Sequence, residues 1–282
     1  LVTVGFLLDD GFYRAVYGPD FPRRVEEGIG KERLREATTL RMLWANLFAL
    51  PVALGGLWVA ARALYPAWKP VLAGRGSFAT KVWLAVIAWL ALTPTVLVLN
   101  AIVNGVYQML FHAPPEQHAL TTLGNRPLPD QALFLFEACV GAPLREEILF
   151  RGVLLAWCVG RTRFLGPGAT GVRPILVMAF AVILAYSVGE KRTAPVAFAG
   201  VLALGLAVLW RFTRTGAPRA RAVYATAALF AVVHSGVWPN PVPLFALGLG
   251  LGWLAVRTNG ILVPVIVHGL FNAVSAVFVL RS

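Results

Sequence analysis

The stretch VWLAVIAWLALTPTVLVLNAIVNGVYQMLF, residues 82–111, holds no Lys, Arg, Asp or Glu and is long enough to cross a lipid bilayer. Further apolar segments of spanning or near-spanning length accompany it, separated by Pro, Gly and basic residues. Together the segments cover residues 41–64, 82–111, 131–159, 174–189, 195–212, 222–237, 241–256 and 261–280. They predict an all-α polytopic integral membrane protein with about eight transmembrane helices.

Composition supports the same class. Of the 282 residues, 58% are hydrophobic and 13% are charged, against about 25% charged in ordinary globular domains. The net charge of +12 comes from basic residues scattered among short loops, while the aromatic residues lie inside apolar runs, so nucleic acid is excluded as a partner. We therefore expect a multi-pass protein of the cell membrane. The basic residues of the loops and those of the first 41 residues indicate opposite orientations, so no sidedness is assigned.

The chain divides into three predicted regions. Residues 1–40 form a charged, partly helical arm, in which VEEGIGKERLREATTL (25–40) has the pattern of a polar helix. Residues 41–130 supply the N-terminal transmembrane helices and loops. Residues 131–280 form the core that carries the chemistry, with an apolar hairpin inserted at about 174–212.

A few ionisable residues fall inside apolar segments, where burial is costly and calls for a reason. In APLREEILFRG, Pro143 is predicted to break a long apolar stretch and to begin a new helical half. Glu147 and Arg151 are four residues apart in the favourable acid-before-base order, which predicts a structural ion pair. Glu146 points about 100° away from that face and is the acid left to face a cavity. Glu137 lies near the start of its segment and is interpreted as structural or interfacial.

Two histidines also lie in membrane segments. His234 follows Phe230 by one helical turn, and His268 and Asn272 share a helical face. A carboxylate, two imidazoles and an amide from three helices can meet in one polar pocket, where they would activate water and stabilise an oxyanion. Singly, each of these side chains has the alternative of a helix–helix hydrogen bond. The glycines at 248, 250 and 252 are expected to permit close helix packing.

The same residues resemble the CAAX prenyl endopeptidase and bacteriocin-processing family of intramembrane proteases, also called the CPBP or ABI family. Its pattern of Glu-Glu-x-x-x-Arg, Phe-x-x-x-His and His-x-x-x-Asn is similar to EEILFR at 146–151, FAVVH at 230–234 and the 28-residue stretch from Phe245 to Asn272. The resemblance covers about 131–280. The chain departs from the family in the 82 residues between Glu147 and Phe230, which accommodate the predicted hairpin.

The resemblance implies an intramembrane endopeptidase that hydrolyses a peptide bond through a Glu/His-activated water. Glu146 and His234 would activate the water, and His268 with Asn272 would stabilise the oxyanion. Supporting roles are expected for Glu147, Arg151 and Phe230. No cofactor is expected, although zinc bound by Glu146, His234 and His268 is an alternative, since these are acceptable zinc ligands. The implied partners are the lipid bilayer and a peptide or membrane-protein substrate, prenylated in the family's eukaryotic case.

A noncatalytic protein on the same scaffold is the alternative from another class. Buried Glu and His side chains also serve proton relays, which would fit a transporter. An assembly or immunity factor would retain the scaffold without the reaction. Internal inverted repeats would favour transport, and the sequence shows none.

Overall fold

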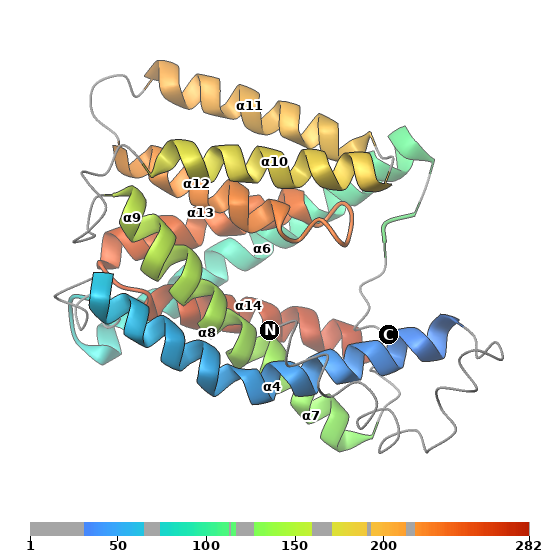
Figure 1. Ribbon diagram of the computed structural model, residues 1–282, viewed down its shortest axis with the longest axis horizontal. Helices are drawn as coiled ribbons and strands as arrows, with labels where there is room; N and C mark the ends of the chain where they lie inside the picture. The colour runs from blue at the N-terminus through green and yellow to red at the C-terminus, as the bar shows by residue number, and fades with distance from the viewer. Residues whose placement is uncertain are drawn as a thin grey trace. The chain divides into compact units, whose positions relative to one another are not determined.

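The computed structural model describes residues 31–64, 74–112, 114–116, 127–159, 171–190, 193–212 and 218–281. Throughout these ranges the regular structure is helical, with no strand (Figure 1). The elements are α4 (Lys31–Leu64), α6 (Phe78–Phe111), α7 (Leu128–Phe136), η2 (Glu137–Gly141), α8 (Ala142–Glu147), η3 (Ile148–Leu155), α9 (Ala156–Cys158), α10 (Val172–Glu190), α11 (Ala194–Phe212), α12 (Pro218–Val232), α13 (Pro241–Thr258) and α14 (Leu262–Arg281). The labels η2 and η3 mark π-helical segments.

Each predicted apolar segment falls on a helix or a continuous helical run, except that 222–237 extends past the end of α12 at Val232. Among the described residues, five stretches are long and apolar enough to cross a membrane: 40–60, 78–111, 172–189, 194–211 and 241–258. A shorter apolar helix covers 262–278. The chain is therefore a multi-pass integral membrane protein. The polar helix expected at 25–40 is described from Lys31, where α4 runs without a break into the first span, and residues 25–30 lie outside the described ranges.

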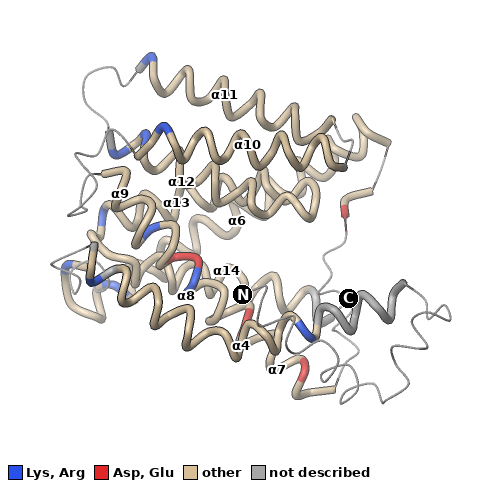
Figure 2. Tube along the Cα trace, viewed as in Figure 1, with Lys and Arg blue, Asp and Glu red and all other residues tan. Residues whose placement is uncertain are grey.

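The chain forms two compact units. Unit 1 comprises residues 1–58, 117–145 and 269–282, and unit 2 comprises residues 59–116 and 146–268. Many basic residues of the described chain lie toward helix ends, whereas an acidic and a basic segment adjoin one another at α8, inside a helical run (Figure 2). The charges that interrupt the apolar pattern are therefore concentrated where the sequence places Glu146, Glu147 and Arg151.

Unit 2 is held together by close helix contacts around α13. A Cβ added to Gly248 would lie 3.2 Å from Ala227, and one added to Gly252 would lie 3.0 Å from Val223, so α12 and α13 approach closely. A Cβ on Gly250 would lie 2.7 Å from Leu92 of α6. The predicted role of these three glycines in close packing is confirmed.

Two of the unit 2 helices have well-defined ends. The hydroxyl oxygen of Ser77 caps α6 by accepting a hydrogen bond from the Thr80 N–H at 3.1 Å. Helix α13 begins with Pro241 in its first turn and ends at Asn259, which adopts the left-handed conformation with φ of 57°. Helix α6 therefore begins, and helix α13 begins and ends, at residues suited to those positions.

In unit 1, the π-helical turn η2 explains how α14 docks. Ala142 donates its N–H to Glu137 O instead of Ala138 O, and Pro143 has no N–H to offer Cys139 O. Asn272 Nδ2 instead donates to Ala138 O at 2.8 Å, and the Cys139 carbonyl faces Gly269. The expected helix break at Pro143 is wrong, because the wide turn carries the helix through the proline.

The close approach at Gly269 predicts a large effect of a single methyl group. A Cβ there would lie 2.4 Å from Cys139 O, a backbone atom that cannot rotate away. Gly269→Ala should lower the free energy of unfolding by about 1–3 kcal/mol, seen as a lower unfolding midpoint in detergent. Gly55→Ala on α4 is the matched control, because nothing lies within 4 Å of its added Cβ, and it should be neutral or stabilising. An unchanged midpoint for Gly269→Ala would contradict this packing.

Candidate active site

Glu147 is the centre of a fully buried polar network in unit 2. Arg151 Nη1 donates to Glu147 Oε1 at 2.9 Å, and both side chains have 0% exposure, so the ion pair predicted from the i, i+4 spacing is present. Arg151 Nη2 donates to Gly248 O at 3.3 Å. The guanidinium carbon also lies 4.5 Å from the centre of the Phe230 ring. The arginine is therefore held from three sides, in keeping with the cost of burying its charge.

Glu147 has a second partner that the sequence does not reveal. Its Oε1 atom lies 2.9 Å from Nδ1 of His268, whose side chain is only 4% exposed. Because a carboxylate only accepts hydrogen bonds, Nδ1 of His268 carries the hydrogen, and Nε2 is the atom turned toward the rest of the site. Glu147 is thus an orienting residue for His268 as well as the partner of Arg151.

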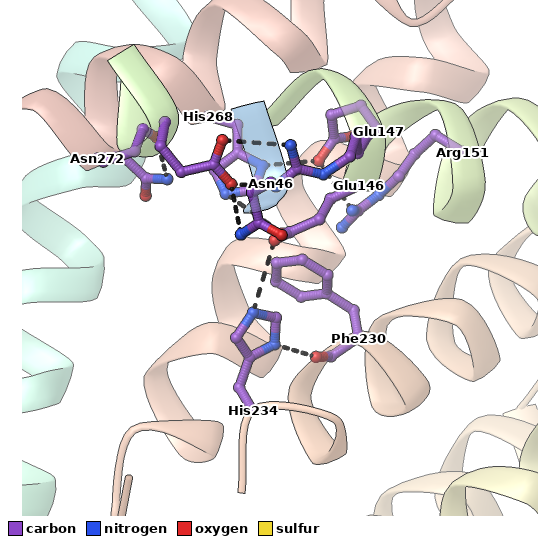
Figure 3. Close-up of polar contacts among 11 residues, drawn as sticks. Asn46, Glu146, Glu147, Arg151, Phe230, His234, His268 and Asn272 are labelled. Carbon is purple, nitrogen blue, oxygen red and sulfur yellow. Dashed lines mark hydrogen bonds and ion pairs between the residues drawn. The ribbon is translucent and has the colours of Figure 1, made fainter. Parts of the chain in front are cut away.

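His234 is oriented in the same way by a different acceptor. Its Nδ1 donates to the Phe230 carbonyl at 2.7 Å, since a carbonyl can only accept. The ring lies just beyond the end of α12, with its Nε2 toward Glu146 (Figure 3). The Phe230 ring contacts both imidazoles, with centroid distances of 4.9 Å to His234 and 5.8 Å to His268. The Phe230 ring is therefore the aromatic contact that the two imidazoles share.

Glu146 lies between the two imidazoles. Its Oε1 atom is 3.9 Å from His234 Nε2, and its Oε2 atom is 3.8 Å from His268 Nε2. These separations are too long for direct hydrogen bonds, but one water could bridge either gap. The carboxylate is 26% exposed and the His234 side chain 34% exposed, so this part of the site is more open than the network around Glu147. Glu146 therefore lies outside the predicted ion pair of Glu147 and Arg151, and it is the more exposed of the two acids.

Asn272 lies four residues beyond His268 in α14 and belongs to unit 1. One of its two amide hydrogens is used in the bond to Ala138 O, which leaves one to donate elsewhere. Unit 1 also contains a polar cluster in which Glu137, 6% exposed, pairs with Arg145 and accepts a hydrogen bond from Asn46 Nδ2 at 3.1 Å. The structural interpretation of Glu137 agrees with these contacts. Asn46 is not among the residues that the sequence analysis singles out. The signal that could have identified it is an amide side chain inside the apolar run of α4.

The donor set of Glu146, His234 and His268 has the chemistry that zinc accepts, because both imidazoles direct Nε2 toward a carboxylate and anchor Nδ1–H elsewhere. The spacing does not suit a bound ion. Ligand atoms around one tetrahedral zinc lie about 3.3 Å apart, less than the 3.8 and 3.9 Å between the carboxylate and the imidazoles. Within the described ranges, no three His, Cys, Asp or Glu side chains are close enough to hold a metal ion. We therefore derive no catalytic step through a metal.

Comparison with known proteins gives one match. The family model described as "Type II CAAX prenyl endopeptidase Rce1-like" matches residues 128–220 and 216–274, together just over half of the chain. No curated protein and no solved structure matches significantly. The matched ranges contain both glutamates, both histidines and Asn272. The chain therefore belongs to the type II CAAX prenyl endopeptidase Rce1-like family of membrane proteases.

Proposed function

We propose that this protein is an intramembrane endopeptidase that hydrolyses a peptide bond with water activated by Glu146 and His234. The observation that carries the proposal is the position of the Glu146 carboxylate, 3.9 and 3.8 Å from the Nε2 atoms of two oriented imidazoles. A water seated there would donate one hydrogen to Glu146 and the other to the unprotonated Nε2 of neutral His234. The water oxygen would then keep a lone pair for attack on a carbonyl carbon.

The reaction proceeds in two steps. Glu146 takes a proton as the water oxygen bonds to the carbonyl carbon, which gives a tetrahedral oxyanion. The proton then passes, directly or through His234, to the amide nitrogen, the carbon–nitrogen bond breaks, and an acid and an amine leave. Ser235 donates its hydroxyl to Val232 O at 2.7 Å, so it has no orientation toward a base, and a covalent intermediate is not proposed.

The oxyanion donors would be His268 and Asn272. Because His268 Nδ1 already donates to Glu147, its Nε2 can donate to an oxyanion only when the ring is an imidazolium. The buried Glu147 carboxylate, 2.9 Å away, would stabilise that positive ring. Asn272 would contribute its remaining amide hydrogen. The proposed substrate is a peptide or membrane protein, with a prenylated C-terminal peptide as the first to test.

The experiment that tests the function compares cell membranes containing either the wild-type protein or Glu146→Gln. Mass spectrometry should find peptides whose new termini depend on the glutamate. Equal peptide populations, combined with no cleavage of a prenylated peptide by the purified protein, would favour the noncatalytic transporter or assembly factor.

Metal removal is expected to leave the activity unchanged. In the proposed mechanism Glu146 acts directly on water, so incubation of purified protein with a strong chelator should alter kcat by less than about twofold. Elemental analysis should find well under one zinc per chain. Loss of activity on chelation, restored by added Zn²⁺, would instead establish the zinc variant with Glu146, His234 and His268 as ligands.

A further inference from the structure

One end of unit 2 presents five exposed arginines that the proposed mechanism does not use. They lie just before α6, in the first turns of α10 and α12, and in the last turns of α11 and α13. We call them the arginine face, which consists of Arg75, Arg173, Arg211, Arg219 and Arg257.

The helix ends that carry these arginines adjoin one another (Figure 2). The Arg75 N–H donates to Thr258 O at 3.0 Å, which joins the start of α6 to the end of α13. The guanidinium carbon of Arg221 lies 4.1 Å from the centre of the Trp210 ring, which joins the start of α12 to the end of α11. The arginines therefore belong to one surface of unit 2.

A pocket lies among the same helix ends. It is lined by Val159 just after α9, by Arg219 of α12 and by residues 259–261 between α13 and α14. Helix α10 begins beside the end of α9, since a Cβ added to Gly171 would lie 3.3 Å from Cys158 Cα. The pocket measures about 20 Å³, against about 10–15 Å³ for one water. An oxygen atom of a bound group can therefore enter beside Arg219.

No acidic residue in the described part of unit 2 lies at the arginine face. Glu146 and Glu147 belong to the catalytic site, and Glu116 accepts a hydrogen bond from Trp238 in the segment between α12 and α13. Glu190 is the last residue of α10, whose first turn lies at the face. The positive charge of the face is therefore not balanced by these acids.

The arginine face lies at the level of the lipid headgroups. Arg173, Arg211 and Arg257 each lie within one residue of the end of a stretch that is long and apolar enough to cross a membrane. Arg75 lies three residues before another such stretch. Because an apolar span ends where the hydrocarbon core ends, these guanidinium groups are at the depth of the phosphates of neighbouring lipids.

Two of the arginines are placed against the helix macrodipole. Arg173 and Arg219 are the second residues of α10 and α12, where free N–H groups make the helix end positive, and neither first turn contains an acid. Arg211 and Arg257, in the last turns of α11 and α13, lie at the favourable negative end. The dipole therefore explains only the second pair. An anion from outside the chain would offset the repulsion on the first pair.

We propose that the arginine face binds the phosphate groups of anionic phospholipids, with Arg173 and Arg219 as the principal contacts. A guanidinium matches two phosphate oxygens, and the N–H groups at the starts of α10 and α12 attract the same anion. A lipid with a net negative charge is favoured over a zwitterionic one, because five cations are gathered on one surface. The inference does not depend on the proposed protease function.

The test measures the thermal unfolding midpoint of the full-length protein in detergent, with phosphatidylglycerol, phosphatidylcholine or inorganic phosphate added. Phosphatidylglycerol should raise the wild-type midpoint by about 5 °C more than phosphatidylcholine does. In Arg173→Gln/Arg219→Gln, this difference should fall to about 1 °C or less. With phosphatidylcholine alone the variant should unfold at the same temperature as the wild type or higher, because it loses the repulsion at two helix starts. Inorganic phosphate should have little effect, because it lacks the acyl chains that hold a lipid at the protein surface.

The matched control is Lys191→Gln/Arg192→Gln, which removes two charges directly after Glu190 in the sequence and should keep the wild-type difference. Equal lipid differences in the wild type and in Arg173→Gln/Arg219→Gln would overturn the inference, as would an equal loss in the control. A rise with inorganic phosphate that matches the rise with phosphatidylglycerol would instead establish a site for free anions. An arginine variant that unfolds below the wild type in phosphatidylcholine would show that these side chains stabilise the fold itself, which equally contradicts the proposal.

Discussion

Glu146→Gln should abolish peptide cleavage while leaving the protein folded in the membrane. The amide keeps the shape of the side chain but cannot take a proton from water, and loss of a general base lowers kcat by about 10²- to 10⁴-fold. The fold should tolerate the change, because the Glu146 side chain is 26% exposed and its nearest imidazole nitrogens are 3.8 and 3.9 Å away. Cleavage of a quenched peptide by purified protein measures the loss.

The matched control for this experiment is Glu116→Gln, another acid-to-amide change in unit 2. Glu116 Oε2 accepts the Trp238 N–H at 2.9 Å, and a glutamine oxygen can accept the same bond. The control should therefore retain activity. A Glu146→Gln protein that cleaves as fast as the wild type would remove the proposed mechanism.

Glu147→Ala should have its main effect on stability. The substitution leaves the guanidinium of Arg151 buried without its carboxylate, and breaking a buried ion pair in this way costs about 3–5 kcal/mol. It also removes the acceptor of His268 Nδ1. The expected result is a low yield of folded protein and a much reduced unfolding midpoint, measured in detergent.

A second variant separates the two roles of Glu147. Glu147→Leu/Arg151→Met removes both charges and fills most of the volume, so it should recover much of the lost stability. Cleavage should not recover, because His268 would still lack the acceptor that fixes its ring. A double variant with full activity would show that the contact between Glu147 and His268 is dispensable, and a stable Glu147→Ala protein would contradict the buried pair.

The parts of this protein that sequence predicts well are those set by local spacing. Apolar runs punctuated by Pro, Gly and basic residues are sufficient to locate the helices, because each span must bury its own backbone hydrogen bonds in lipid. The ion pair of Glu147 and Arg151 follows from i, i+4 geometry within one helix. The same geometry directs Glu146 away from that pair, so helical spacing alone is sufficient to distinguish the two acids.

The parts that could not be predicted depend on contacts between distant segments. The bond from His268 to Glu147 joins residues 121 positions apart, so no helical periodicity reveals it. At Pro143 the local rule predicts a break, but a π-helical turn widens the helix and leaves the Ala138 carbonyl for Asn272. The low helix propensity of proline is a property of that residue alone. The conformation that the chain adopts also depends on Asn272 of α14, which supplies the hydrogen bond to Ala138 O.

The hydrogen bond from His234 to its own helix determines which ring nitrogen would exchange protons during turnover. The backbone N–H of His234 donates to Ala231 O, so Phe230 O lacks the backbone donor that a continuing α-helix would give it. The imidazole Nδ1–H donates to Phe230 O instead. The ring thus caps α12 by satisfying one of the carbonyls that the end of the helix leaves without a backbone donor. The cap requires a hydrogen on Nδ1 in either charge state, so protons would enter and leave through Nε2 alone.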